Sequence, residues 1–153
     1  MFGPLEEKDV EPVQELIATE FPYLRNPRLQ VQAKLNLPAF FLFKIEREKK
    51  LAGFIELEKL AAKIVRLNGL AVFPRFRKKG VGTELLKESI LFLKQNRFEK
   101  VELLVKRENK VAQKMYQKAG FVWVSTLEKE IDDAVVDEYA LQLSPRKKWL
   151  GIF

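Results

Sequence analysis

The chain of 153 residues contains no cysteine and no histidine. The lack of cysteine excludes disulfides, thiolate metal sites and a cysteine nucleophile, and the lack of histidine removes the commonest general base. A zinc site is not expected, because both of its usual ligand types are missing. No apolar run approaches the ~20 residues of a membrane span, and the first residues have no signal-peptide pattern. We therefore expect a cytoplasmic protein with no metal ion and no membrane partner.

Composition and length fit one globular domain over residues 1–153. Hydrophobic residues make up 47% of the chain and charged residues 32%, a balance that is typical of folded proteins. The net charge of +7 has two explanations, which are attraction to polyanions such as RNA and a partial balance for the phosphates of a cofactor. Because the charges are interspersed along the chain, we favour the second explanation and expect no nucleic-acid partner.

The hydrophobic pattern predicts an α+β fold. The first helix is predicted between Asp9, which is its N-cap, and Phe21. Further helices are predicted over residues 27–36, 82–95 and 109–120. Strands are predicted over residues 39–46, 51–59, 64–73, 101–106, 121–130 and 135–143, with the last two joined by a turn at Asp132 and Asp133. This order gives a mixed, mostly antiparallel central sheet with helices on both faces. Only the strands that begin near residues 64 and 99 are expected to run parallel, on either side of a crossover helix.

A glycine-containing loop joins the strand that ends near Phe73 to the helix that follows. Its sequence is Arg77-Lys78-Lys79-Gly80-Val81-Gly82-Thr83. Glycine permits backbone conformations in which consecutive N–H groups converge, and a helix N-terminus favours negative charge. The three basic side chains add mobile positive charge at the rim. The alternative is a plain tight turn, because the dinucleotide and P-loop fingerprints are both incomplete here. We interpret the loop as a diphosphate site, which points to a nucleotide-bearing cofactor.

A second motif lies in the helix that begins after Asn109. It reads Asn109-x-x-Ala112-x-x-x-Tyr116-x-x-x-Gly120-Phe121. Together with Arg77-x-x-Gly80-x-Gly82, it resembles the GCN5-related N-acetyltransferase (GNAT) family, best from about residue 50 to residue 121. The resemblance implies a GNAT-like acyl-CoA N-acyltransferase fold in which the two parallel strands splay apart to hold pantetheine. Only residues 2–6 are available for the first strand of that fold, so we expect this strand to be short or missing.

The resemblance also implies which residues contact acetyl-CoA, the acetyl donor. They are Leu70, Ala71, Val72, Arg77, Lys78, Lys79, Gly80, Val81, Gly82, Thr83, Asn109, Ala112 and Tyr116. The family places the thioester beside the splayed strand. The backbone N–H of Leu70 or Val72 is therefore the implied donor to the thioester oxygen.

Tyr116 is the candidate general acid. A phenol with a pKa of ~10 can protonate a departing thiolate whose conjugate acid has a pKa near ~8.5. In the resembled family a tyrosine at this place often has that role. The alternative is that Ala112, Tyr116 and Ala119 only form the buried face of an amphipathic helix, with the hydroxyl bonded to a carbonyl group.

Glu56 is the candidate general base. It shares one face of its predicted strand with Glu58, next to the cofactor strand, and burial there would raise its pKa towards a useful range. The alternatives are a solvated sheet face and a reaction in which bulk water takes up the proton. Asn68 could position a water or the substrate. Arg66 stands where some family members carry a catalytic glutamate.

The sequence thus predicts an N-acetyltransferase that moves an acetyl group from acetyl-CoA to a primary amine. The amine is that of a protein N-terminus, a lysine or a small molecule, and its attack is direct, in a ternary complex, because no cysteine can carry the acetyl group. The acceptor pocket is expected between residues 21–26, the strand from Leu51 and the hairpin at residues 129–133. The alternatives are a non-catalytic CoA-binding sensor or interaction module, and a nucleic-acid-binding domain.

The last nine residues, 145–153, are basic and then apolar. This tail could dock on its own domain, pair with a second subunit in a homodimer or contact an acidic surface. Docking on its own domain is the expectation that we adopt.

Overall fold

The computed structural model describes residues 1–21 and 27–143. Its strands are β1 (Phe2–Pro4), β2 (Phe40–Arg47), β3 (Lys50–Ala61), β4 (Ile64–Val72), β5 (Lys100–Lys106), β6 (Val122–Thr126) and β7 (Val136–Gln142). Its helices are α1 (Val10–Glu20), α2 (Pro27–Lys34), α3 (Val81–Gln95) and α4 (Lys110–Lys118), with short 3-10 turns η1 (Glu7–Asp9) and η2 (Pro74–Phe76). The predicted docking tail and residues 22–26 of the predicted acceptor pocket lie outside the described residues.

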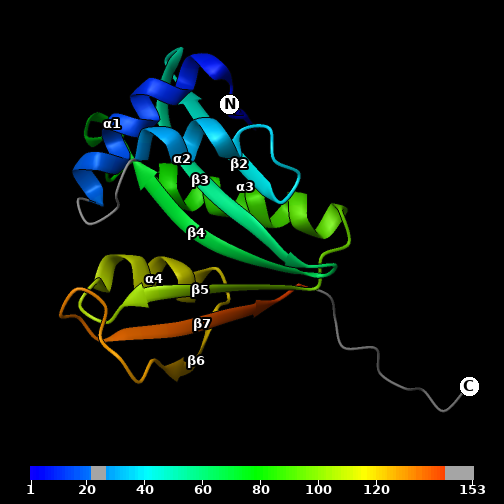
Figure 1. Ribbon diagram of the computed structural model, residues 1–153, viewed down its shortest axis with the longest axis vertical. Coiled ribbons are helices and arrows are strands. Elements are labelled where there is room, and N and C mark those ends of the chain that lie inside the picture. Colours follow the sequence, from blue (N-terminus) through cyan, green and yellow to red (C-terminus); the bar gives the residue numbers. More distant parts are fainter. Residues whose placement is uncertain (22–26, 144–153) are drawn as a thin grey trace, which may run out of the picture.

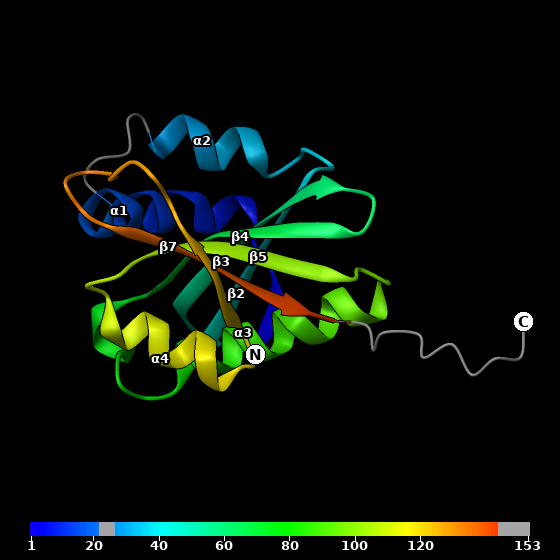
Figure 2. The ribbon, with the colours of Figure 1, turned by 90° about the horizontal axis from the view of Figure 1, so that it is seen from below.

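These strands form one sheet in the order β1-β2-β3-β4-β5-β7-β6. The pair β4 and β5 is parallel, and the other neighbouring pairs are antiparallel. Helices α1 and α2 cover one face of the sheet, and α3 and α4 cover the other (Figure 1 and Figure 2). The predicted fold class is therefore confirmed, including the position of the parallel pair. The first strand is short, as predicted.

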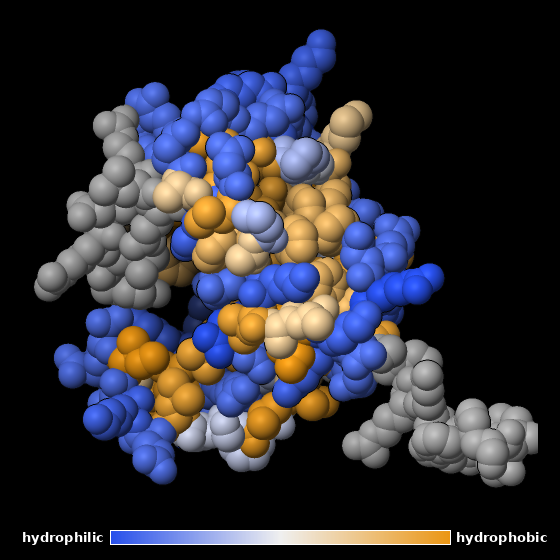
Figure 3. Space-filling model, turned by 45° about the vertical axis from the view of Figure 1, so that its right-hand side comes forward, coloured by the Kyte–Doolittle hydropathy of each residue, from blue (hydrophilic) through white to orange (hydrophobic). Residues whose placement is uncertain are grey.

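Two apolar clusters lie on opposite faces of the sheet. Ile55 and Leu57 of β3 pack with Leu85 of α3 in the larger cluster. Phe54, on the other face of β3, packs with Val13 of α1 in the smaller one. Because helices cover both faces of the sheet, the central strands are buried on both sides. In the space-filling view, apolar side chains also reach the surface in the middle of the face shown, with hydrophilic side chains around them (Figure 3).

Strand β6 is shorter than the predicted strand over residues 121–130. It ends at Thr126 after a register shift against β7. Beyond Thr126 the Leu127 N–H still donates to the Val136 carbonyl at 3.0 Å, and the hairpin closes with an isolated bridge between Ile131 and Ala134. A bulge increases the local twist and interrupts the ladder. The predicted turn is confirmed, since Asp132 and Asp133 both have positive φ.

Asp9 does not cap α1 in the predicted way. Its carboxylate accepts the Glu6 N–H at 2.8 Å and the Lys44 ammonium at 2.7 Å. Lys44 is only 5% exposed. Burial alone lowers the pKa of Lys44, but hydrogen bonds and ion pairs with Asp9 and Glu46 outweigh it and raise that pKa overall. A buried ammonium requires a carboxylate partner, and this requirement decides where the Asp9 side chain lies.

A second ion pair fixes the segment that leads from β5 into α4. Arg107 donates to both carboxylate oxygens of Asp137 in β7, at 2.9 and 2.7 Å. Asp137 is 3% exposed and also accepts from Thr126 and Trp123. The Arg107 hydrogen bonds are the largest cause that lowers the pKa of Asp137 far below its usual range. This arrangement anchors the chain two residues before Asn109, the cap of α4.

Asp137→Asn is expected to lower the free energy of unfolding at pH 7 by about 2 kcal/mol, because a charge-assisted set of hydrogen bonds is lost. The folded-state pKa of Asp137 is lowered, so its stabilising effect is present above the unfolded pKa of about 4 and is lost as the pH falls through the folded-state value. Urea unfolding at pH 7 and pH 3 should therefore give a smaller difference between wild type and variant at pH 3. An equal difference at both pH values would contradict the ionic role. Asp133→Asn, on the exposed turn, is the charge-matched control.

Candidate functional site

The parallel strands β4 and β5 pair over only part of their length. Their ladder runs from Ile64 opposite Lys100 to Leu67 opposite Leu103. Beyond this point β4 continues against β3 as far as Val72, while β5 continues against β7. The two strands diverge towards the carboxyl end of each, where the ribbons separate (Figure 1). The edge of β4 that faces β5 therefore has no ladder partner at its last residues.

Two backbone N–H groups on that edge of β4 point away from β3. The Phe73 N–H donates to the Ala52 carbonyl at 2.8 Å, so this pair is a hydrogen-bonded one. Hydrogen-bonded and non-hydrogen-bonded pairs alternate along an antiparallel ladder. The N–H group of Ala71 therefore points to β3, whereas the N–H groups of Leu70 and Val72 point to the opening beside β5. These are the two amides that the sequence singled out as donors to a thioester oxygen.

The glycine-containing loop lies directly after this edge. Lys78 and Gly80 have positive φ values of 60° and 78°, and Gly80 is the N-cap of α3 with no side chain to cap it. The Glu84 N–H donates to the Gly80 carbonyl at 3.0 Å. The N–H groups of the first α3 residues, Val81, Gly82 and Thr83, precede this bond and have no partner within the helix. Such a series of free amides at a helix N-terminus fits a phosphate group.

The two glycines of the loop have different physical roles. A Cβ on Gly80 would meet nothing within 4 Å, so that residue is required for its left-handed conformation alone. A Cβ on Gly82 would lie 3.2 Å from Met115 Sδ and 3.4 Å from Leu70 Cδ2. Gly82 therefore allows the start of α3 to approach both β4 and α4 closely. A larger residue there would fill the space beside the opening between the strands.

Arg77 does not supply the mobile charge that the sequence suggested. Its guanidinium pairs with Glu20 at the end of α1, and its Nε donates to the Val72 carbonyl at 3.1 Å. The side chain thus ties the loop to the ends of α1 and β4. Lys78 and Lys79 are exposed and form no ion pair within the described residues, so they are the basic side chains that stand free at the loop.

Tyr116 lies on the buried side of α4. The helix begins as predicted, with the Asn109 side chain accepting the Ala112 N–H at 3.2 Å, and Gly120 beyond its end has a φ of 103°. Tyr116 is 7% exposed, the centre of its ring lies 5.6 Å from that of Phe121, and burial raises its pKa to about 12. Within the described residues its hydroxyl has no hydrogen-bond partner. The hydroxyl oxygen is not fully enclosed by protein atoms, so it keeps contact with solvent.

Glu56 lies on the opposite face of the sheet from Tyr116. It is 8% exposed, so the alternative of a solvated sheet face is wrong. Asn68 of β4 donates to it at 2.7 Å, and the Lys34 ammonium of α2 lies 3.1 Å from each carboxylate oxygen. Asn68 also donates to Glu58 at 3.1 Å. The β3–β4 register shift opposite Asn68 produces this cluster, since Glu56 is opposite Gly69 and Leu57 opposite Leu67.

Sequence reasoning missed Lys34 and Met115. Lys34 is 22 residues from Glu56 in the chain, and nothing in its local pattern distinguishes it from other surface lysines. One feature of the sequence could have pointed to Met115, because it directly precedes Tyr116 in the second motif. On a helix, the residue next to a buried one lies at the border of the buried face.

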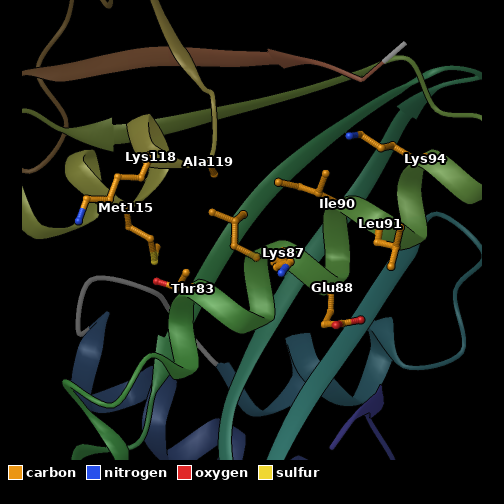
Figure 4. A pocket seen from close by; sticks show the side chains of 10 residues that line it. Thr83, Lys87, Glu88, Ile90, Leu91, Lys94, Met115, Lys118 and Ala119 are labelled. Atoms are coloured by element: carbon orange, nitrogen blue, oxygen red, sulfur yellow. The ribbon is translucent and has the colours of Figure 1, made fainter. Parts of the chain in front are cut away.

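A pocket of about 440 Å³ lies between α3 and α4. Its lining comprises Thr83, Leu86, Lys87, Glu88, Ile90, Leu91, Lys94, Met115, Lys118 and Ala119. At one end Thr83 of α3 and Met115 of α4 lie side by side, next to the glycine-containing loop, while Lys94 lies at the other end (Figure 4). The pocket therefore opens beside the loop, on the same face of the sheet as Tyr116.

The comparisons with known proteins agree with this arrangement. The sequence profile of the acetyltransferase (GNAT) family matches residues 10–121. The chain belongs to the GNAT family. No curated protein matches the sequence of this GNAT chain significantly.

Solved structures of other acetyltransferases share the fold. The ribosomal-protein-S18-alanine N-acetyltransferase from Escherichia coli superposes with a TM-score of 0.84 at 19% identity, covering 98% of this chain and 97% of its own. Aminoglycoside 6'-N-acetyltransferase in complex with coenzyme A gives 0.81 at 15% identity, covering 97% and 99%. Spermidine N-acetyltransferase from Vibrio cholerae, in complex with CoA and spermine, gives 0.81 at 20% identity, covering 94% and 95%.

Two further observations concern the described residues. None of the helices there is both long enough and apolar enough to cross a bilayer. Nor does this part of the chain bring together three or more of the side chains that commonly hold a metal ion.

Proposed function

We propose that this GNAT chain is an acetyl-CoA-dependent N-acetyltransferase, acting in the cytoplasm as one domain on a primary amine. The observation that carries the proposal is the meeting of three features at one end of the sheet. These are the free amides at the start of α3, the unpaired N–H groups of Leu70 and Val72, and an acid and a base on opposite faces. The acceptors named for the solved relatives, a ribosomal protein, an aminoglycoside and spermidine, all offer amines.

The residues present fit acetyl-CoA as the donor. The amides of Val81, Gly82 and Thr83 would hold the diphosphate, with the exposed Lys78 and Lys79 as additional positive charge. The unpaired edge of β4 would hold the pantetheine through its free backbone groups. The pocket between α3 and α4 adjoins this loop and offers room for the nucleoside end. Acetyl-CoA supplies the activated acetyl group.

The chain's own groups have separate tasks in the transfer. The Leu70 or Val72 N–H would stabilise the negative charge that develops on the carbonyl oxygen. Glu56 would accept a proton from the ammonium of the acceptor on the α1 and α2 face. Tyr116 would donate a proton to the departing sulfur from the α3 and α4 face. Because acid and base approach from opposite faces, acceptor and donor can occupy the site together, which is what direct attack requires.

The experiment that tests this proposal measures release of free thiol from acetyl-CoA with a panel of amines: peptides with free N-termini, lysine peptides, polyamines and amino sugars. We expect turnover with at least one class. The second candidate, a CoA-binding sensor, predicts tight binding by calorimetry without turnover across the panel. It has support in the Lys34–Glu56 ion pair, which occupies the candidate base.

Glu56→Gln is expected to lower kcat by roughly 10- to 100-fold at pH 7, because the acceptor ammonium loses its proton acceptor. The loss should shrink as the pH rises towards the pKa of the acceptor amine, which then needs no base. The thiol-release assay over a pH series checks this. Glu102→Gln is the matched control, since Glu102 is also a partly buried, ion-paired strand glutamate but lies where β4 and β5 still pair. A loss that is constant with pH would argue against a base.

A further inference from the structure

Lys34 brings a primary amine to the candidate base. Its Nζ lies 3.1 Å from both Glu56 oxygens, and its side chain is 23% exposed. The same Nζ lies 5.0 Å from the centre of the Phe40 ring, over its face. An ammonium held between a carboxylate and an aromatic face is bound in the way that a protein binds an alkyl ammonium ligand.

This amine also lies beside the candidate reaction centre. Glu56 is opposite Gly69 in the β3–β4 ladder, and Gly69 directly precedes Leu70, whose N–H is a candidate donor to the thioester oxygen. Asn68 fixes the Glu56 carboxylate from β4 at 2.7 Å. Lys34 therefore has the base in contact and the unpaired edge of β4 next to that base. The long, flexible lysine stem leaves the amine free to move from this position.

We propose that Lys34 is an intramolecular acetyl acceptor, so that the protein acetylates its own α2. The proposal rests on the proposed function. Glu56 takes one proton from the Lys34 ammonium, and the neutral Nζ attacks the thioester carbon of acetyl-CoA. An N–C bond forms and the C–S bond breaks. The departing sulfur takes a proton from Tyr116, which regains one from solvent. The second proton lost by the nitrogen passes to solvent, and Glu56 then also releases its proton to solvent. Two protons leave the nitrogen and one returns through Tyr116, so the products are acetyl-Lys34, CoA thiol and one released proton.

Other ion-paired lysines in the described residues lack this combination. Lys8 pairs with Glu6 on the exposed surface. Lys44 of β2 is enclosed by Asp9 and Glu46, away from the diverging strands. Lys100 pairs with Glu102, where β4 and β5 are still joined. Lys34 alone among these pairs with the carboxylate that we assign as base. Acetylation would remove its charge and leave Glu56 without its ammonium partner.

The test is incubation of the full chain with isotope-labelled acetyl-CoA, followed by peptide mass mapping over time. Lys34 should gain one acetyl group roughly tenfold or more faster than Lys63, an exposed lysine, because its amine is held close to the reaction centre. The rate should not depend on protein concentration, as befits a reaction within one chain. Glu56→Gln should slow it by roughly tenfold or more. Lys34→Arg keeps the positive charge beside Glu56 and should abolish this modification while keeping affinity for acetyl-CoA.

Several outcomes would overturn the proposal. One is equal labelling of Lys34 and Lys63, and another is labelling of Lys34 that is as fast in urea as in the folded protein. A rate proportional to protein concentration would assign the transfer to two chains. Calorimetry with acetyl-CoA and thiol release with external amines, run on the same preparation, test the proposed function separately. Binding and turnover without Lys34 labelling would reject only the self-acetylation.

Discussion

Tyr116→Phe is expected to lower kcat by about 10²-fold or more, the usual contribution of a positioned general acid, with little change in the KM for acetyl-CoA. The hydroxyl has no hydrogen-bond partner within the described residues, so its removal should change the free energy of unfolding by only a few tenths of a kcal/mol. Because burial raises the pKa of Tyr116 to about 12, the phenol stays protonated from about pH 6 to about pH 10. The ratio of wild-type to variant kcat should therefore be constant over that range.

Steady-state kinetics over a pH series, together with thermal unfolding, measure both expectations. Tyr139→Phe is the matched control, because Tyr139 is 5% exposed in the same core and its hydroxyl accepts from Gln117 at 3.4 Å. That variant should keep kcat. An unchanged rate for Tyr116→Phe at every pH would mean that Tyr116 only packs α4 against the sheet. That is the alternative role that its helical spacing allowed.

Gly80→Val is expected to raise the Kd for acetyl-CoA by roughly 10²-fold. A β-branched residue resists the φ of 78° at this position, so the loop would rearrange and at least two amides would turn away from the diphosphate. Hydrogen bonds to a charged group contribute about 1.5–3 kcal/mol each, and 1.4 kcal/mol is tenfold in Kd. The fold should persist, since a Cβ there meets nothing within 4 Å.

Gly80→Asn separates conformation from space in the same experiment. Asparagine tolerates the left-handed region far better than valine, and the surroundings of Gly80 are open. Calorimetry should therefore give a Kd for Gly80→Asn close to that of the wild type. If Gly80→Val binds acetyl-CoA as tightly as the wild type, the diphosphate is held elsewhere and the assignment of the loop is wrong. Equal losses of affinity in the Asn and Val variants would mean that the added side chain, and not the backbone conformation, weakens binding.

The hairpins of the sheet were predictable because they depend on patterns that are local in sequence. The alternation along β3 and the turn at Asp132 and Asp133 specify their hairpins through neighbours a few residues away. The end of β6 was not predictable, because the bulge against β7 is a property of the pair of strands. Likewise, the Asp9 side chain followed the buried Lys44, which is 35 residues away, and not the local capping preference.

The sequence by itself determined the glycine-containing loop and the capped α4, since a left-handed glycine or an Asn cap acts within one turn of backbone. Only the tertiary structure decided which charged side chains form ion pairs and which do not. Glu20 engages Arg77 from 57 residues away, and Lys34 engages Glu56 from 22. Burial of Tyr116, and hence its high pKa, likewise needs the whole core. Ion pairing and desolvation depend on distances in space, which the order of residues does not contain.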